Sequence, residues 1–401
     1  MKGRWELDSA RGWSVVVAGA VGAGAAFGTV YTFGAFFDAM VDDLGAGRGP
    51  TALVFGITLL AFFGVGMVAG PLADRFGPRR LALTGAVLLP VGLLLTSRVD
   101  SVVSGYVTYS LGVGLGGGLV IAPMYTAAGG WIVRRRALAL GVLATGNGLG
   151  TLMLVPLAER LIADRGWRDA YVTLAVIDVV VLTACGLVVL RPPIAAAPPA
   201  LAWMQTVAAT DAFQRLFVTT LLFSIGLYVA FGLAVDFSTA DGIDPERAAL
   251  LVGLIGAASV LGRLGLTAVA GRVASVRLLQ YCLGAQPVAF TIWLVAGSSY
   301  PLLVIFALTL GVGYGGFVAL GPEVALGYFG VVGLGGIMGL LFLAFGLGGL
   351  VGPPFAGWLA DTSDGSTVPI VFAVITSLLA FALSLTLPIG IRHASPPQRS
   401  R

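Results

Sequence analysis

Long apolar runs, separated by short polar or glycine- and proline-rich breaks, organise the whole chain. About 20 residues rising roughly 1.5 Å each cross the ~30 Å hydrocarbon core of a membrane, and these runs reach that length. The pattern predicts an all-α, polytopic membrane protein of about twelve transmembrane helices. The predicted spans are 14–37, 51–73, 81–97, 102–130, 137–162, 169–190, 216–238, 248–270, 278–297, 301–322, 333–358 and 367–390.

Composition strengthens this assignment and excludes several kinds of chemistry. The chain is 58% hydrophobic and 10% charged, with a mean hydropathy of +0.98, whereas soluble domains carry about 25% charged residues. Cys185 and Cys282 lie in apolar runs, which favours small core residues over a disulfide or a metal site. His393, the single histidine, lies in a polar tail. We therefore expect no enzyme activity, no cofactor, no metal and no nucleic-acid partner, and we find no phosphate-binding loop that would support ATP-driven transport.

The distribution of basic residues predicts the orientation. With the N-terminus inside, sixteen of the 23 basic residues fall on the cytoplasmic side and six on the opposite side, which also takes most of the acids. The positive-inside rule then places both termini in the cytoplasm of a multi-pass protein of the cell membrane, plasma or inner.

The two halves of the chain repeat, which predicts the domain organisation. Six identities recur at one offset of 198 residues, and a weaker match of segment 73–75 with segment 270–272 lies at 197. We expect a six-helix bundle at 1–190, a Pro/Ala-rich cytoplasmic linker at 191–215, and a second six-helix bundle with a short tail at 216–401. The six pairs are Gly148 with Gly346, Leu149 with Leu347, Gly150 with Gly348, Pro156 with Pro354, Ala158 with Ala356 and Leu161 with Leu359.

Arg263 is the only charged residue between positions 248 and 271. A guanidinium stays charged in any protein environment, and its burial within a membrane costs at least about 2.5–3.5 kcal/mol on insertion scales. In the repeat at offset 197 it replaces Gly66. An intramembrane charge that departs from a duplicated scaffold indicates a specialised site.

A basic segment at 70–80, GPLADRFGPRR, joins the second and third predicted spans. Its glycines permit close packing and a tight turn, and its aspartate can accept hydrogen bonds at a helix end. It resembles the signature loop of the major facilitator superfamily, whose transporters are built from parallel six-helix repeats. The resemblance implies a latch that holds the two halves and yields as they rock; the alternative is a loop that only sets topology. The latch role is carried over to Gly70, Asp74, Arg75, Gly77, Arg79, Arg80 and Arg134.

Other segments narrow the resemblance to monocarboxylate-porter-type members of that superfamily, and oxalate–formate exchangers are relatives. Members of this group move lactate, pyruvate and related small organic acids by alternating access, usually with a proton. The resemblance therefore implies a secondary active transporter of a small organic anion, coupled to protons. The segments are RGW at 11–13, YTFGAFF at 31–37, WIVRRRALALG at 131–141, GNGLG at 146–150, GWR at 166–168 and GPPFAGWLAD at 352–361.

In this group an arginine of the eighth span binds the substrate carboxylate, and Arg263 stands in that place. A planar fork of donors matches a carboxylate in bidentate geometry, so the chemistry agrees. The alternative is a permanent pairing with an internal acid or with helix carbonyls. Two positions depart from the mammalian porters, because Ser259 replaces an aspartate and Tyr31 a first-span lysine. Both side chains can still hydrogen-bond a substrate, but the usual proton-coupling pair is missing.

Further candidates follow from the helices that line the cavity in this family. Tyr125, Tyr314 and Phe317 fall on the fourth and tenth spans, where each is a substrate contact or a packing residue. Asn147, in the fifth span, is expected to form an interhelical hydrogen bond, with substrate contact as the alternative.

Three intramembrane acids are candidates for proton coupling. Asp236 lies near the outer end of the seventh span, where it pairs with Arg263 or marks the helix end. Asp178, deep in the sixth span, is expected to be structural or protonated rather than a substrate contact. Glu323 follows Pro322 near the cytoplasmic end of the tenth span, where it is a gate or a solvated end.

Two other functions are compatible with the same sequence. One is an exporter of larger neutral or cationic metabolites or drugs, in which Arg263 is structural. The other is a membrane sensor that does not transport. Whatever its function, we expect the protein to be a monomer in a lipid bilayer.

Overall fold

A computed structural model describes residues 7–132, 136–191, 201–269, 272–329, 334–363 and 365–389. These residues form helices joined by turns and loops, and no strand occurs among them. The elements of the first part of the chain are α1 (Ala10–Tyr31), α2 (Phe33–Leu44), α3 (Arg48–Phe76), α4 (Pro78–Thr96), α5 (Val102–Val107), the π-helical turn η1 (Thr108–Val113), α6 (Gly114–Trp131), α7 (Arg136–Arg165) and α8 (Trp167–Val188). Those of the second part are α9 (Leu201–Ala208), α10 (Asp211–Ala240), α11 (Pro245–Val269), α12 (Ser275–Ala296), α13 (Tyr300–Phe329), α14 (Leu334–Ser363) and α15 (Thr367–Ser384).

Twelve segments of the described chain are long and apolar enough to cross a membrane, which confirms the predicted number of spans. The first runs through both α1 and α2 and ends at Leu44, beyond the predicted end at residue 37. The predicted linker, residues 191–215, contains the helix α9 and the start of α10, while residues 192–200 lie outside the described part.

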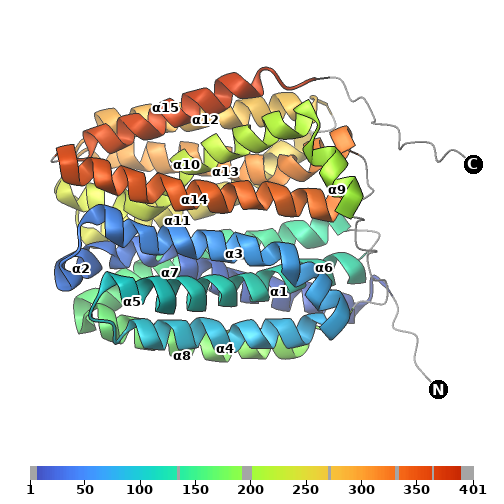
Figure 1. Ribbon diagram of the computed structural model, residues 1–401, viewed down its shortest axis with the longest axis horizontal. Coiled ribbons are helices and arrows are strands. Elements are labelled where there is room, and N and C mark those ends of the chain that lie inside the picture. The colour runs from blue at the N-terminus through green and yellow to red at the C-terminus, as the bar shows by residue number, and fades with distance from the viewer. Residues whose placement is uncertain are drawn as a thin grey trace, which may run out of the picture.

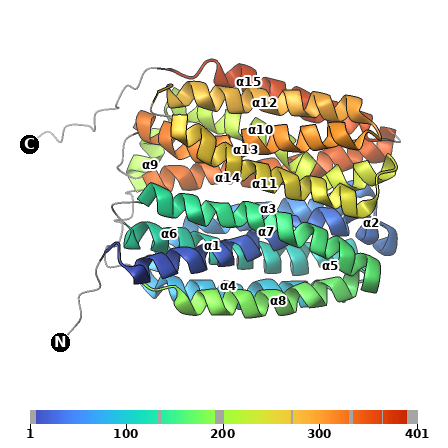
Figure 2. The same cartoon turned by 180° about the vertical axis from the view of Figure 1, so that it is seen from behind.

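The helices form two groups (Figure 1). We call α1–α8 the N-terminal half and α10–α15 the C-terminal half; the first lies below and the second above in this view. α1 begins and α15 ends at the same side of the bundle, and the reverse view agrees (Figure 2). We call the opposite side, where α3 begins and α14 ends, the distal end.

The outward faces of the peripheral helices are apolar. Val87 and Leu95 of α4, Val180 of α8 and Val295 of α12 are each more than half exposed, at 60%, 53%, 63% and 67%. A soluble monomer rarely exposes a contiguous apolar surface of this kind. This is the surface expected of a multi-pass membrane protein, with lipid as its solvent.

The two halves meet along α3 with α14 and along α7 with α11. In the second pair, a Cβ atom at Gly148 would lie 2.4 Å from the carbonyl oxygen of Gly256, so the helix backbones touch there. Gly141 lies seven residues earlier on the same face of α7, and a Cβ atom there would meet no atom of the described residues within 4 Å. The halves are therefore in contact from the distal end to the middle of the bundle, and α7 and α11 part beyond it.

Candidate functional site

Arg263 lies where α7 and α11 part. Its neighbours Leu261 and Leu264 are 66% and 54% exposed on the membrane face of α11, whereas Arg263 is 6% exposed and turned into the bundle. Its Nη1 donates a hydrogen bond to the carbonyl oxygen of Ala144 in α7, across the two halves. The guanidinium carbon also lies 5.8 Å from the ring centroid of Tyr314 in α13, in cation–π range.

Close packing of α11 on α13 brings Tyr314 to the arginine. A Cβ atom at Gly315 would lie 1.9 Å from the carbonyl oxygen of Ser259, and one at Gly262 would lie 2.1 Å from that of Val312. No larger residue fits at either position without moving a backbone. These glycines let the two helices approach closely, as is usual for membrane helices, and so fix Arg263 against the aromatic ring.

Tyr31 and Tyr228 face each other between the halves. Both are buried, and the hydroxyl of Tyr31 donates to that of Tyr228 at 3.4 Å. They are 197 residues apart, the same offset that relates Gly66 to Arg263, so the two tyrosines are repeat partners. The Tyr31 ring meets Phe231 with centroids 4.5 Å apart, and Phe231 meets Tyr314 at 5.7 Å. A continuous aromatic cluster therefore connects Tyr31 with the surroundings of Arg263.

Tyr125 and Asn147 complete the polar surroundings. The side-chain amide of Asn147, in α7, donates to the hydroxyl of Tyr125, in α6, at 3.4 Å, which is the interhelical hydrogen bond expected from the sequence. Asn147 lies three residues from Ala144 and so on the same face of α7. The structure thus brings five of the seven predicted substrate-binding residues together.

Ser259 and Phe317 are occupied by packing. The Ser259 hydroxyl is buried and donates to the carbonyl oxygen of Gly256, at 2.6 Å, within its own helix. Phe317 is buried and stacks on Phe223 with centroids 4.2 Å apart. A role of either residue in substrate binding stays a prediction.

The three acidic candidates lie in three different places. Asp178 is buried and accepts a hydrogen bond from the Thr29 hydroxyl, at 2.8 Å, inside the N-terminal half. Glu323 is exposed and accepts from the hydroxyl of Ser275, at 2.6 Å. The helix α13 continues to Phe329, so Glu323 does not mark a helix end, and its role as a gate stays a prediction. Asp236 pairs with Arg48, so the predicted alternative in which it pairs with Arg263 is wrong.

The loop predicted to be a latch is a tight turn between α3 and α4. Gly77 has a φ of 90°, which L-residues with a side chain rarely adopt, and this confirms the turn expected there. Arg79 and Arg80 are exposed. The side chains at Gly70, Asp74 and Arg75, and the whole of Arg134, lie outside the described part, so the latch role stays a prediction.

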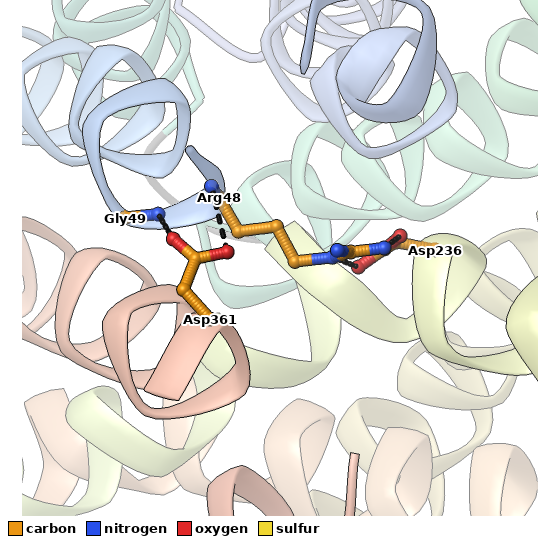
Figure 3. Close-up of polar contacts among 4 residues, drawn as sticks. All are labelled: Arg48, Gly49, Asp236 and Asp361. Atoms are coloured by element: carbon orange, nitrogen blue, oxygen red, sulfur yellow. Dashed lines mark hydrogen bonds and ion pairs between the residues drawn. The ribbon is translucent and has the colours of Figure 1, made fainter. Parts of the chain in front are cut away.

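A second polar cluster closes the distal end (Figure 3). Nε and Nη2 of Arg48, the first residue of α3, donate to the two carboxylate oxygens of Asp236 in α10, at 3.0 and 3.2 Å. Asp236 is 1% exposed, whereas the Arg48 side chain is 37% exposed. The pair links the N-terminal half to the C-terminal half in bidentate geometry, the strongest arrangement of such a pair.

Asp361 joins the halves at the same place. It lies near the end of α14, and its carboxylate accepts from the backbone N–H groups of Arg48 and Gly49, each at 3.1 Å. These are N–H groups of the first turn of α3, which lack partners within the helix and which favour a negative charge. We call Arg48, Gly49, Asp236 and Asp361 the distal gate.

Sequence reasoning named Asp236 but missed the rest of the distal gate, and it also missed Tyr228. The predicted spans left Arg48 in a loop, because a glycine-rich break surrounds it. Its partners Asp236 and Asp361 are 188 and 313 residues away along the chain, and no sequence pattern links them to it. Tyr228 had a usable signal, since it is the counterpart of Tyr31 at the repeat offset.

Comparison with known proteins gives consistent matches. A family model described as the Major Facilitator Superfamily matches residues 19–286. The chain is 30% identical to monocarboxylate transporter 13 of Bos taurus, over 98% of this chain and 93% of that protein. It is also 30% identical to monocarboxylate transporter 3 of Rattus norvegicus, over 90% and 76%. A bacterial homolog of the human lysosomal transporter Spinster, solved in an inward-facing and unoccupied conformation, matches with a TM-score of 0.75 and 14% identity over 95% and 98%.

Proposed function

The chain belongs to the Major Facilitator Superfamily, and we propose that it carries a small monocarboxylate, such as lactate or pyruvate, across a membrane by alternating access. Its family and its relatives are transporters, so the chain is a transporter and not an enzyme. The substrate and the coupling are the proposal.

The observation that carries the proposal is the position of Arg263. A guanidinium presents five N–H donors in a rigid planar fork that matches a carboxylate, and it cannot lose its charge. Arg263 is buried, and it lies at the point where the contact between α7 and α11 ends. An anion held there is in reach of both halves, which is what a carrier needs if binding is to influence how the halves move.

The surroundings of Arg263 support a small substrate. Tyr31, Tyr125, Tyr228 and Tyr314 offer hydroxyl groups on aromatic walls, which suit a short carboxylate with an apolar part and a hydroxyl or keto group. The Asn147 amide oxygen is buried and has no hydrogen-bond partner among the described residues, so it can accept from a substrate hydroxyl.

For the topology, we propose that both termini lie in the cytoplasm and that the distal end faces the outside of the cell membrane. The support is the excess of basic residues on the side of the termini. With this orientation, the distal gate closes the outer end of the contact between the two halves. We further propose two six-helix bundles that rock against each other, and a protein that works as a monomer.

We propose that a proton accompanies the anion. Tyr31 and Ser259 stand where the mammalian porters have a lysine and an aspartate, so the titrating group lies elsewhere in this chain. Asp178 and Asp236 are buried carboxyl groups and Glu323 is exposed, which makes the first two the better candidates.

The test is binding and counterflow with purified protein in proteoliposomes. A panel of mono- and dicarboxylates is compared between the wild type, Arg263→Gln and the control Arg98→Gln, an exposed arginine at the distal end. We expect monocarboxylate binding and counterflow in the wild type and in Arg98→Gln, and none in Arg263→Gln, with all three proteins monodisperse.

Each alternative predicts a different result. An exporter of neutral or cationic compounds would bind those compounds equally in the wild type and in Arg263→Gln, and would ignore the carboxylates. A sensor would show no counterflow with any substrate. Unchanged carboxylate uptake in Arg263→Gln would contradict the proposed role of this residue.

A further inference from the structure

Asp178 of α8 is a carboxyl group buried between two helices of the N-terminal half. It is 1% exposed, and its Oδ2 accepts the hydrogen bond from the hydroxyl of Thr29 in α1, at 2.8 Å. Its Oδ1 is also buried and has no hydrogen-bond partner among the described residues. An ionised carboxylate offers about four acceptor sites, so a single hydroxyl leaves most of them unused.

No counter-charge compensates this carboxyl group in the part of the chain that the structure describes, where Asp178 forms no ion pair. Arg168, in the first turn of the same helix, lies roughly 15 Å away along the axis and pairs with an acid of α2. The titratable groups beside the contact are phenols: Tyr109 of η1 donates to the carbonyl oxygen of Thr29, at 3.4 Å, and its ring lies 5.7 Å from that of Tyr171. Among the described side chains, the charged residues of the helices packed on α8 are Arg11 of α1, Asp38, Asp42 and Asp43 of α2, Arg79 and Arg80 of α4, and Glu159, Arg160, Asp164 and Arg165 of α7.

A lone carboxylate in such a place is costly. Transfer of an unpaired ion into an apolar interior is so unfavourable that the group takes up a proton instead. A bound metal cation is a poor alternative, because hard cations take about six or more oxygen ligands, and the contact supplies two carboxylate oxygens and one hydroxyl. Asp178 is therefore a neutral acid in this conformation, with its proton on Oδ1.

The corresponding contact of the C-terminal half carries no acid. Gly226 of α10 is the counterpart of Thr29 at the offset of 197, and a Cβ atom there would lie 2.8 Å from Oγ of Ser377 in α15. That hydroxyl donates within its own helix, to the carbonyl oxygen of Ala373. The packing of these helices thus does not require an ionisable group, and Asp178 departs from the duplicated scaffold as Arg263 does.

Thr29 is connected to the surroundings of Arg263 through an irregular turn of the first span. Helix α1 ends at Tyr31, and the next N–H group, that of Thr32, is shared between the carbonyl oxygens of Gly28 and Thr29, at 3.0 and 3.2 Å. The N–H group of Ala35 bonds to the carbonyl oxygen of Thr32, three residues back, at 2.8 Å. A 3₁₀-type turn inside a long helix often marks a functional hinge. A shift of α1 at Thr29 would therefore also move Tyr31.

We propose that Asp178 carries the coupled proton: it is protonated while α1 packs on α8, and it ionises when α1 moves and admits water. On release, the O–H bond at Oδ1 breaks, the proton passes to a water molecule and the carboxylate keeps the electron pair. The inference rests on the transport of an anion with a proton proposed above, and it names the group that holds that proton. Asp178 acts on the substrate through Thr29 and Tyr31, so it is a positioning residue.

Loss of the proton weakens the site for the anion. An ionised Asp178 requires water at α1, and the movement that admits this water displaces Tyr31 from Tyr228. Since the protonated form holds the binding arrangement, the affinity for a monocarboxylate falls as the pH rises through the range in which Asp178 ionises. A single proton changes this affinity by up to about tenfold per pH unit.

The first experiment detects the proton without any substrate. Infrared spectra of purified wild type and variants are compared at neutral pH, in the carbonyl-stretch region of protonated carboxylic acids. We expect a band that Asp178→Asn lacks and that moves to higher frequency in Thr29→Val, because Oδ2 of Asp178 loses its hydrogen bond. Asp169→Asn, which replaces an exposed acid in the first turn of the same helix, is the matched control and should keep the band unchanged.

The second experiment separates coupling from transport in proteoliposomes. Counterflow exchanges substrate without net movement of protons, whereas uphill uptake driven by an inward proton gradient requires coupling. Asp178→Asn keeps the shape of the neutral acid and can accept from Thr29. We expect this variant to retain monocarboxylate counterflow, to lose uphill uptake and to bind with an affinity that does not depend on pH. Asp169→Asn should match the wild type in all three measurements.

The assignment would be overturned by a wild type without the infrared band, or by uphill uptake that persists in Asp178→Asn. Loss of counterflow together with uphill uptake in Asp178→Asn would overturn it as well, because Asp178 would then serve transport itself. A wild type without any carboxylate counterflow would contradict the proposed substrate instead, and the infrared band would still decide whether Asp178 holds a proton.

Discussion

Two arginines lie between the two halves of this transporter, and their surroundings differ. Arg48, at the distal end, is bound by the carboxylate of Asp236 in bidentate geometry, and the backbone of the same residue is held by Asp361. Arg263, in the middle of the bundle, donates to the carbonyl oxygen of Ala144 and lies against the ring of Tyr314. The first arginine serves to hold the halves together. The second lies among hydroxyl groups and aromatic rings, where we propose that an anionic substrate binds.

Arg48 and Arg263 together show that a charged residue between the two halves does not by itself indicate a substrate site. The partner separates the role we propose for each arginine: a carboxylate from the opposite half holds Arg48 in place, whereas the neutral polar groups around Arg263 leave its guanidinium suited to bind an anion. Variants that affect one arginine and spare the other can therefore separate conformational from binding effects.

The largest effect is expected for Arg48→Gln. Removing one member of a buried ion pair costs about 3–5 kcal/mol, and less here because the Arg48 side chain is 37% exposed. We expect the closed-to-open ratio of the distal end to fall by at least about a hundredfold, which corresponds to ~2.8 kcal/mol. The measurement is the rate at which a thiol reagent modifies Ser238→Cys, a buried position two residues from Asp236.

Arg160→Gln is the matched control for this variant. Arg160 forms an ion pair with Glu246 across the same two halves, but both side chains are exposed, at 65% and 52%. Pairs of this kind contribute about 0–1 kcal/mol, so the labelling rate should change little. Equal labelling rates in Arg160→Gln and Arg48→Gln would show that Arg48 has no special role in closure.

The second effect concerns Arg263→Lys, which keeps the charge and loses the planar fork. A hydrogen bond to a charged group contributes about 1.5–3 kcal/mol, so the affinity for a monocarboxylate should fall roughly tenfold to a hundredfold. Labelling of Ser238→Cys should stay at the wild-type rate. Full carboxylate affinity in Arg263→Lys would mean that the charge alone suffices and that bidentate geometry is not used.

A smaller effect is expected for Asp361→Asn. An asparagine offers one oxygen, so one of the two N–H groups of Arg48 and Gly49 loses its acceptor, and the charge at the helix N-terminus disappears. Each change is worth about 1 kcal/mol or less, so thiol labelling at Ser238→Cys should accelerate severalfold and remain below the rate in Arg48→Gln. A rate above that of Arg48→Gln would reverse the order of importance within the gate.

The smallest effect is expected at the pair Tyr31 and Tyr228. Their hydroxyl groups are 3.4 Å apart, which is long for an O–H···O hydrogen bond, so its contribution is at most about 0.5 kcal/mol. Tyr31→Phe, Tyr228→Phe and the double variant form a thermodynamic cycle, measured by thermal unfolding with and without substrate. A coupling that grows when substrate is bound would identify both hydroxyl groups as substrate contacts.

Several features of the fold and of the candidate site could be predicted from the sequence, because they depend on residues that are close together along the chain. Apolar runs of sufficient length predicted the twelve spans, and Gly77 predicted the turn after α3. A lone charge in the run around Arg263 predicted a buried guanidinium. The repeat offset predicted which positions correspond, although the pair of Tyr31 with Tyr228 went unrecognised.

The sequence by itself determined the class, the number of spans and the position of Arg263 within its helix, because hydrophobic burial and helical rise depend on residues that are close along the chain. Only the tertiary structure decided that Asp236 pairs with Arg48 and not with Arg263. By charge alone, the Asp236 carboxylate could pair with either Arg48 or Arg263. The packing of α14 against both α3 and α10 selected between them, since an ion pair forms only between groups that the helices bring within about 3–4 Å.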